Sequence, residues 1–241
     1  MMDVMIITLA EARNNFNLVS DNLQLHADKI NTNMEEPIDI TITAMNQFFD
    51  IAEGVDASKK EFVANDITDI GEHGLSLLEK LIFKANDLHD LVEKTDLEQI
   101  AVVIADWIIQ RDGNINILEP IVEALAQIAN SVDDQEQLIA LAEFMGEIAD
   151  ACSDSIKQDL ELSNMHRPWR ILNINRGIVA TRTNDPKTMR SVFADLIKAL
   201  PMDAPGFFKE GMSEMIRLDY PQNVRDVMQE YFEQTDMPKI H

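Results

Sequence analysis

Apolar side chains recur along the first 91 residues at spacings that alternate between four and three. The first stripe comprises Met5, Leu9, Ala12, Phe16, Val19, Leu23, His26 and Ile30; the second comprises Ile38, Ile42, Met45, Phe49 and Ala52; the third comprises Val63, Ile67, Ile70, Gly74, Leu77, Leu81, Leu88 and Leu91. This spacing places each set on one face of a helix, where it can pack against a neighbouring helix. The pattern predicts an antiparallel bundle of long helices in residues 1–95.

One segment has a competing interpretation as a strand. Residues 38–43 alternate between apolar and polar side chains with a period of two, as in a half-buried strand. The heptad spacing nevertheless continues through Phe49, and no partner strand is evident. We therefore expect a helix here, with Pro37 near its first position.

An internal repeat organises the last part of the chain. Residues 186–193 match residues 221–228 at an offset of 35, with identical Pro, Arg and Val, and Gly177 matches Gly211 at an offset of 34. Helix breaks are predicted at residues 183–186, 200–205 and 218–221. Asp185 is placed to cap the helix that Pro186 begins.

A weaker repeat extends the pattern toward the middle of the chain. Residues 96–100 resemble residues 134–138 at an offset of 38, and both segments open amphipathic helices. Periods of 34 to 38 residues with two helices each are typical of helical hairpin arrays. The predicted fold class is all-α, with a bundle in residues 1–95 and α-hairpin repeats in residues 96–241.

Residues 170–241 resemble tetratricopeptide-type helical repeats. Five residues carry the resemblance, where that pattern has glycine, an aromatic side chain or proline: Gly177, Phe193, Pro201, Phe207 and Gly211. The sequence departs from the pattern at Arg176, Ala180 and Met189. The resemblance implies stacked helix pairs, a fold that usually binds peptide segments of other proteins.

Charge is divided unevenly along the 241 residues. The chain carries 43 acidic and 20 basic side chains, a net charge of −23. Residues 1–163 hold 33 acidic and 9 basic side chains, a net of −24, whereas residues 164–241 hold 10 and 11, a net of +1. The acidic part repels nucleic acid, so direct nucleic-acid binding is not expected, and the arginine-rich part can attract an anion.

The arginines are the candidate partner-binding residues. The candidates are Arg170, Arg176, Arg182, Arg190 and Arg225. Arg190 and Arg225 occupy equivalent repeat positions, so stacked repeats would align them as a ladder. Arginine binds carboxylates in two-point geometry, which suits an acidic peptide or a C-terminus. The alternative is that these arginines pair with carboxylates within the fold.

Motifs for catalysis and cofactor binding are missing from the sequence. It has no phosphate-binding glycine loop, no nucleophile elbow and no zinc-protease helix motif. The single cysteine, Cys152, lies in an acidic segment that would raise the pKa of its thiol. We expect no catalytic residues, no cofactor and no metal ligands. The remaining metal hypothesis is a bundle site built from His26, His73 and His89.

These observations predict a non-enzymatic protein–protein interaction module. Three features favour a cytoplasmic protein that does not span a membrane: the single cysteine, Asp3 near the N-terminus and the lack of a long apolar segment. The expected partner is a protein or an acidic peptide segment, and amphipathic surfaces would also permit a homo-oligomer. The alternatives are an acidic decoy of a nucleic-acid-binding protein and a metal-binding helical bundle.

Overall fold

A computed structural model describes residues 7–30 and 37–236. Among these residues it contains eleven helices, and the only β pairing is an isolated bridge between Ile115 and Cys152. The predicted all-α class is confirmed. The expectations that involve Met5 and Asp3 lie outside the described residues.

The chain divides into two compact units. The N-terminal unit comprises residues 2–128 and 150–156, and the C-terminal unit comprises residues 129–149 and 157–241. The expected boundary between residues 95 and 96 falls inside the helix Leu91–Ile109. This helix belongs to the N-terminal unit, since it packs against two earlier helices of that unit.

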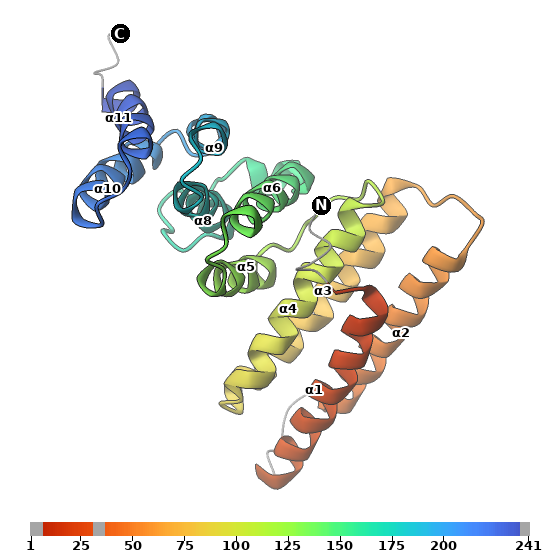
Figure 1. Cartoon of the computed structure of the whole chain (residues 1–241). Coiled ribbons are helices and arrows are strands. Elements are labelled where there is room, and N and C mark those ends of the chain that lie inside the picture. Colours follow the sequence, from red (N-terminus) through yellow and green to blue (C-terminus); the bar gives the residue numbers. More distant parts are fainter. Residues whose placement is uncertain (1–6, 31–36, 237–241) are drawn as a thin grey trace. The chain divides into compact units, whose positions relative to one another are not determined.

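Four long helices form the bundle of the N-terminal unit, and a fifth helix follows (Figure 1). They are α1 (Leu9–Ile30), α2 (Ile38–Ala57), α3 (Ala64–Asp87), α4 (Leu91–Ile109) and α5 (Glu119–Ser131), whose last residues, from Ala129 on, belong to the C-terminal unit. Helix α1 packs against α2 and α4, and α3 packs against α2 and α4, so the four long helices surround one core. The helical interpretation of residues 38–43 is confirmed.

Local signals in the sequence explain where these helices begin and end. The Thr8 hydroxyl accepts a hydrogen bond from the Glu11 amide at 3.2 Å, and the Glu11 carboxylate accepts one from the Thr8 amide at 2.8 Å, which is a capping box at the start of α1. The third stripe, expected to run to Leu91, is interrupted after Asp87. His89 turns the chain there with a φ of 58°, a conformation that ends a helix.

Aromatic rings fill the core of the bundle. The ring of Phe49 lies 5.6 Å from that of Phe16 and 5.4 Å from that of Phe48, and Phe48 lies 6.5 Å from Trp107. Gly74 of α3 lies directly against Phe48, because a Cβ there would be 2.6 Å from a ring carbon. A glycine on the apolar stripe therefore makes room for an aromatic side chain from α2.

The C-terminal unit contains two consecutive helix pairs. Its helices are α6 (Gln135–Ala151, whose last two residues belong to the N-terminal unit), α8 (Pro168–Arg182), α9 (Pro186–Ala199), α10 (Ala204–Arg217) and α11 (Gln222–Asp236); the short α7 (Asp154–Lys157) belongs to the N-terminal unit except for Lys157. Helix α8 packs against α9, α10 against α11, and α9 against α11. The three predicted helix breaks are confirmed.

The predicted cap of α9 is also confirmed. The Asp185 carboxylate accepts hydrogen bonds from the amide and the hydroxyl of Thr188, at 2.8 and 2.7 Å. The bonds from Thr188 lower the pKa of Asp185 despite its partial burial. Pro186 follows at the first helical position, where a missing amide proton costs nothing.

Candidate functional site

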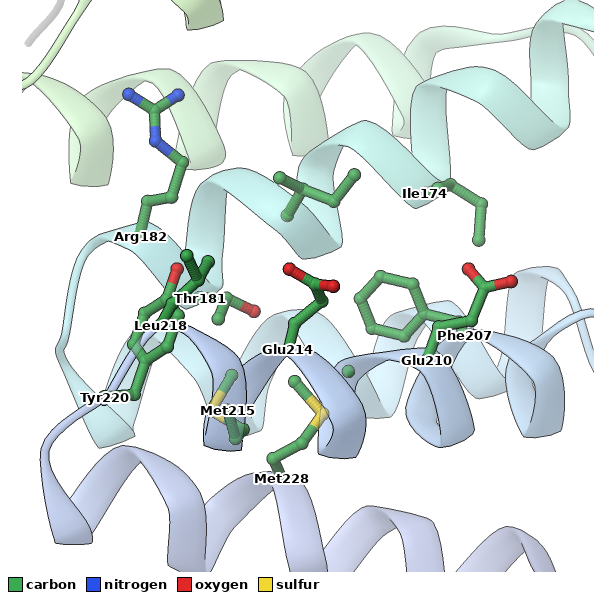
Figure 2. A pocket seen from close by; sticks show the side chains of 12 residues that line it. Ile174, Thr181, Arg182, Phe207, Glu210, Glu214, Met215, Leu218, Tyr220 and Met228 are labelled. Carbon is green, nitrogen blue, oxygen red and sulfur yellow. The ribbon is translucent and has the colours of Figure 1, made fainter.

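A groove lies between α8 and α10 in the C-terminal unit. Its volume is about 370 Å³. Figure 2 shows side chains from both helices converging on this space, with the turn after α10 at one end and Met228 of α11 beneath it. The lining residues are Ile174, Ile178, Thr181, Arg182, Phe207, Glu210, Gly211, Glu214, Met215, Leu218, Tyr220 and Met228.

The walls and floor of the groove are mainly apolar. Ile178 on the α8 side is 46% exposed, whereas Met215 and Met228 on the opposite side are buried. Leu218, at the end of α10, is 52% exposed. The groove therefore presents apolar surface that the unit does not cover itself, with flexible methionines that adapt to the shape of a bound group.

Two glycines set how closely the surrounding elements approach. A Cβ on Gly211 would lie 2.6 Å from the Met228 sulfur, and a Cβ on Gly177 would lie 2.8 Å from a ring carbon of Phe207. Met228 can therefore reach α10, and the Phe207 ring can lie against the backbone of α8. These are the two glycines that mark the sequence repeat.

Two carboxylates project into the groove from α10. Glu210 and Glu214 lie one helical turn apart, and Figure 2 shows both extending toward α8. Glu214 is bound by Arg217, with an Oε2–Nη2 distance of 2.5 Å, and this hydrogen bond lowers the pKa of Glu214. Glu210 has no ion pair or hydrogen bond within the described part of the chain. One carboxylate of the groove is thus available to a ligand.

Arg182 lines the groove at one edge, but its guanidinium group points away from it. It donates hydrogen bonds of 2.5 Å to the carbonyls of Ala129 and Val132, and it lies 3.2 Å from an oxygen of Asp133. Ala129 belongs to the last turn of α5, where carbonyls lack helical partners. Arg182 therefore satisfies the end of a helix, as basic side chains commonly do.

Arg170 and Arg176 also bind groups within the unit. Arg170 donates to Asp203 at 2.7 Å and to the Met165 carbonyl at 3.0 Å. Arg176 donates to the Ala142 carbonyl of α6 at 3.0 Å and contacts Asp195 of α9 at 3.2 Å. The helix face that receives Arg176 carries Gly146, whose missing side chain leaves space for the guanidinium group.

Arg190 and Arg225 have different surroundings despite their equivalent positions in the repeat. Arg190 of α9 reaches Glu230 of α11 at 3.0 Å. Arg225 of α11 instead turns back to the preceding loop, where it donates to the Tyr220 carbonyl and to Asp219, both at 2.5 Å. All five candidate arginines thus have partners within the unit, which is the alternative that the sequence left open.

The sequence reasoning missed the most deeply paired arginine. Arg167 is 3% exposed and contacts Asp159 at 2.5 Å and Asp203 at 2.6 Å. Burial alone would raise the pKa of Asp203, but hydrogen bonds from Arg170 and Arg167 outweigh it and hold this pKa below its ordinary value. The sequence signal was the dense set of charges around Pro168, which did not reveal how they pair.

The three candidate metal-binding histidines are not brought together with further ligands. His26 contacts the Asp90 carboxylate through Nδ1, whereas His73 and His89 are exposed. Within residues 7–30 and 37–236, no group of three or more His, Cys, Asp or Glu side chains is arranged to hold a metal ion.

A second cavity, in the N-terminal unit, has four acidic side chains in its lining. It has a volume of about 440 Å³, and its charged lining residues are Glu79, Lys94, Glu98, Glu119 and Glu123. Lys94 pairs with the buried Glu98 at 2.9 Å. Burial and, to a smaller extent, repulsion from Glu119 raise the pKa of Glu79. Only one of these four carboxylates has a cationic partner among the residues that the structure describes.

Comparison of the chain with protein-family models, with curated proteins and with solved structures finds no match. None of the described helices combines the length and apolar character needed to cross a lipid bilayer. The functional interpretation therefore depends on the geometry of the chain itself.

Proposed function

We propose that the chain is a non-enzymatic protein-interaction module that binds a peptide segment of a partner protein in the groove between α8 and α10. The observation that carries this proposal is the groove itself, an uncovered apolar channel with the carboxylate of Glu210 beside it. Its volume of about 370 Å³ lies in the usual range for ligand sites, about 300–1,000 Å³, and suits a few side chains of a peptide.

The proposal includes a tandem arrangement of two helical hairpins, α8–α9 and α10–α11. Asn184 and Asp219, 35 residues apart, have φ values of 53° and 51° in the turns before α9 and α11. Buried side chains also recur at this offset: Met189 and Val224, Val192 and Val227, Phe193 and Met228, and Leu196 and Tyr231. In this arrangement the first helix of each hairpin contributes one wall of the groove.

The arginines have a supporting role in this proposal. They bind groups of neighbouring helices and loops, and binding of an acidic peptide by Arg190 and Arg225 would require release of Glu230 and Asp219. Arg190, with 49% of its side chain exposed, would give up its partner more easily than the more covered Arg225. We propose a cytoplasmic location because the single cysteine allows no intrachain disulfide.

The test uses the full chain and a random 12-residue peptide display library. The best selected peptide is synthesised with a fluorescent label, and its affinity is measured by anisotropy. Ile178→Gln removes an apolar side chain from the groove, and we expect affinity to fall about tenfold, since burying such a side chain contributes about 1.5–3 kcal/mol. The matched control is Ile216→Gln, which changes a 76% exposed isoleucine of α10 outside the groove lining.

Two outcomes would contradict the proposal. One is a library that yields no binding peptide. The other is a selected peptide whose affinity is the same for the native chain, Ile178→Gln and Ile216→Gln. Far-ultraviolet circular dichroism of each variant establishes that helix content is retained, so that a loss of affinity reports on the groove.

A second candidate, an acidic decoy that occupies a nucleic-acid-binding protein, is favoured by the charge of the N-terminal unit. Residues 2–128 and 150–156 carry 26 acidic and 8 basic side chains, a net charge of −18. A complex of this kind would be dissociated by moderate salt and displaced by duplex DNA. Salt-resistant binding through the groove would favour the first function.

A further inference from the structure

We infer that the groove between α8 and α10 selects a peptide that carries a lysine or arginine next to its apolar anchor, with the cationic end bound by Glu210, on the wall that also carries Glu214. This inference rests on the proposed function and adds the chemistry of the partner. It reverses the sign of the ligand that the arginine-rich sequence predicted.

Within the described part of the chain, the groove keeps one unpaired charge after the internal ion pairs are formed. Arg182 directs its guanidinium group away from the groove, to the carbonyls of Ala129 and Val132 and to the carboxylate of Asp133. Arg217 is committed to Glu214. The Glu210 carboxylate has no such partner among the described residues, so the site retains net negative charge, which repels an acidic peptide.

Glu210 and Glu214 occupy positions i and i+4 of α10. Side chains at positions i and i+4 of a helix have Cβ atoms about 5–6 Å apart and lie on the same face. An ammonium group with three donors, or a guanidinium group in two-point geometry, can bind Glu210, whose carboxylate has no partner among the described residues. Figure 2 shows both carboxylates extending from α10 toward α8, with the ring of Phe207 between them in this view.

The α8 wall of the groove is apolar. Ile174 lies opposite Glu210 in Figure 2, and Ile178, one helical turn further along α8, also lines the groove. Lysine and arginine have apolar stems that cover such surfaces while their charged ends remain hydrated or paired. A groove with isoleucines on one wall and carboxylates on the other matches both parts of a basic side chain.

The net charge of the chain favours one class of partner for the groove. The chain has a net charge of −23, so a second copy would approach against long-range repulsion. A basic segment is instead attracted by the same field. Charge complementarity, both with the carboxylates of the groove and with the net charge of the chain, therefore favours a basic partner segment over a second copy of this chain.

The test is a double-mutant cycle on the full chain. The labelled peptide obtained by display is compared with a version in which its basic residue is replaced by norleucine, which keeps the apolar stem. This replacement should weaken binding to the native chain about tenfold, because a hydrogen bond to a charged group is lost. The double variant Glu210→Gln/Glu214→Gln should bind both peptides equally, whereas Glu233→Gln, an exposed carboxylate of α11, should behave like the native chain.

The possible results separate this inference from the proposed function. Loss of the difference between the two peptides only in Glu210→Gln/Glu214→Gln supports the inference. Two results overturn the inference and leave the proposed function standing. One is a selected peptide whose affinity depends on Ile178 but which has no basic residue. The other is a peptide whose norleucine replacement lowers the affinity equally for every variant. If no selected peptide depends on Ile178, both are overturned.

Discussion

At the scale of single residues, the arginines of the C-terminal unit act mainly as internal connectors. Arg167, Arg170 and Asp203 form one such cluster, in which a single carboxylate receives two guanidinium groups at 2.6 and 2.7 Å. Asp203 precedes α10 and both arginines lie at the start of α8. The cluster thus joins the beginnings of the two helices that form the walls of the groove.

The lowered pKa of Asp203 makes this cluster sensitive to acid. A carboxyl group whose pKa is lower in the folded than in the unfolded chain stabilises the fold above its unfolded pKa, and this contribution is lost as pH falls through the folded pKa. Asp203→Asn should therefore lower the free energy of unfolding by about 2 kcal/mol at pH 7. The difference in the free energy of unfolding between Asp203→Asn and the native chain should become smaller below a pH of about 4.

Urea unfolding at a series of pH values, followed by the fluorescence of Trp169 in a Trp107→Phe background, measures this effect. Trp169 is buried and lies beside Arg170 in the sequence. Asp226→Asn, an exposed carboxylate of α11, serves as the control and should have little effect at any pH. A deficit for Asp203→Asn that persists unchanged at pH 3 would mean that packing, rather than charge, explains it.

At the scale of helices, glycines determine how closely neighbouring elements pack. Gly74 of α3 is opposite the buried ring of Phe48, and Phe48 is confined by Phe49 and Trp107. At Gly54 of α2, the position that a Cβ would take has no described atom within 4 Å other than its chain neighbours and the backbone of its own helix. The same substitution at these two helical glycines should therefore have opposite effects.

Gly74→Ala should destabilise the N-terminal unit by about 1–3 kcal/mol, because the aromatic ring cannot move aside without straining the core. Gly54→Ala should stabilise it by up to about 1 kcal/mol through the better helix propensity of alanine. Both predictions are tested by urea unfolding in a Trp169→Phe background. The unfolding midpoint of each glycine variant is measured by the fluorescence of Trp107. Stabilisation by Gly74→Ala would contradict the close contact with Phe48.

Much of the secondary structure could be predicted from the sequence, because its signals are local. The heptad stripe identified α2 despite the strand-like alternation of residues 38–43, and Asp185 with Pro186 identified the start of α9. The turn at His89 was missed because the apolar spacing on either side of it continues. A spacing rule alone cannot separate two consecutive helices from one long helix.

The groove could not be predicted from such local signals. Its walls are contributed by residues about 30 positions apart, and its depth depends on how Phe207 and Met228 pack against Gly177 and Gly211. The partners of Arg182 are backbone carbonyls about 50 residues away, which have no signature in the sequence. The sequence identified the arginines as important but could not distinguish internal pairing from partner binding.

At the scale of the whole molecule, negative charge is concentrated in one unit. The N-terminal unit has a net charge of −18, and the C-terminal unit, with 17 acidic and 12 basic side chains, has a net charge of −5. Like charges held in a compact state repel one another and lower its stability. Each unit contains one buried tryptophan, Trp107 or Trp169, so the two can be followed separately.

Salt should therefore stabilise the two units to different extents. Raising the NaCl concentration from about 0.01 M to about 0.1 M shortens the Debye length from about 30 Å to about 10 Å, which screens repulsion across the bundle. Because urea is uncharged, it does not change the ionic strength. The urea concentration at the unfolding midpoint therefore reports the effect of the added NaCl alone. We expect a clear rise in the midpoint reported by Trp107 in the Trp169→Phe variant and a smaller rise in that reported by Trp169 in the Trp107→Phe variant. Equal rises at both tryptophans would mean that repulsion is not concentrated in the N-terminal unit, and the attraction of a basic partner would then depend on the local carboxylates of the groove alone.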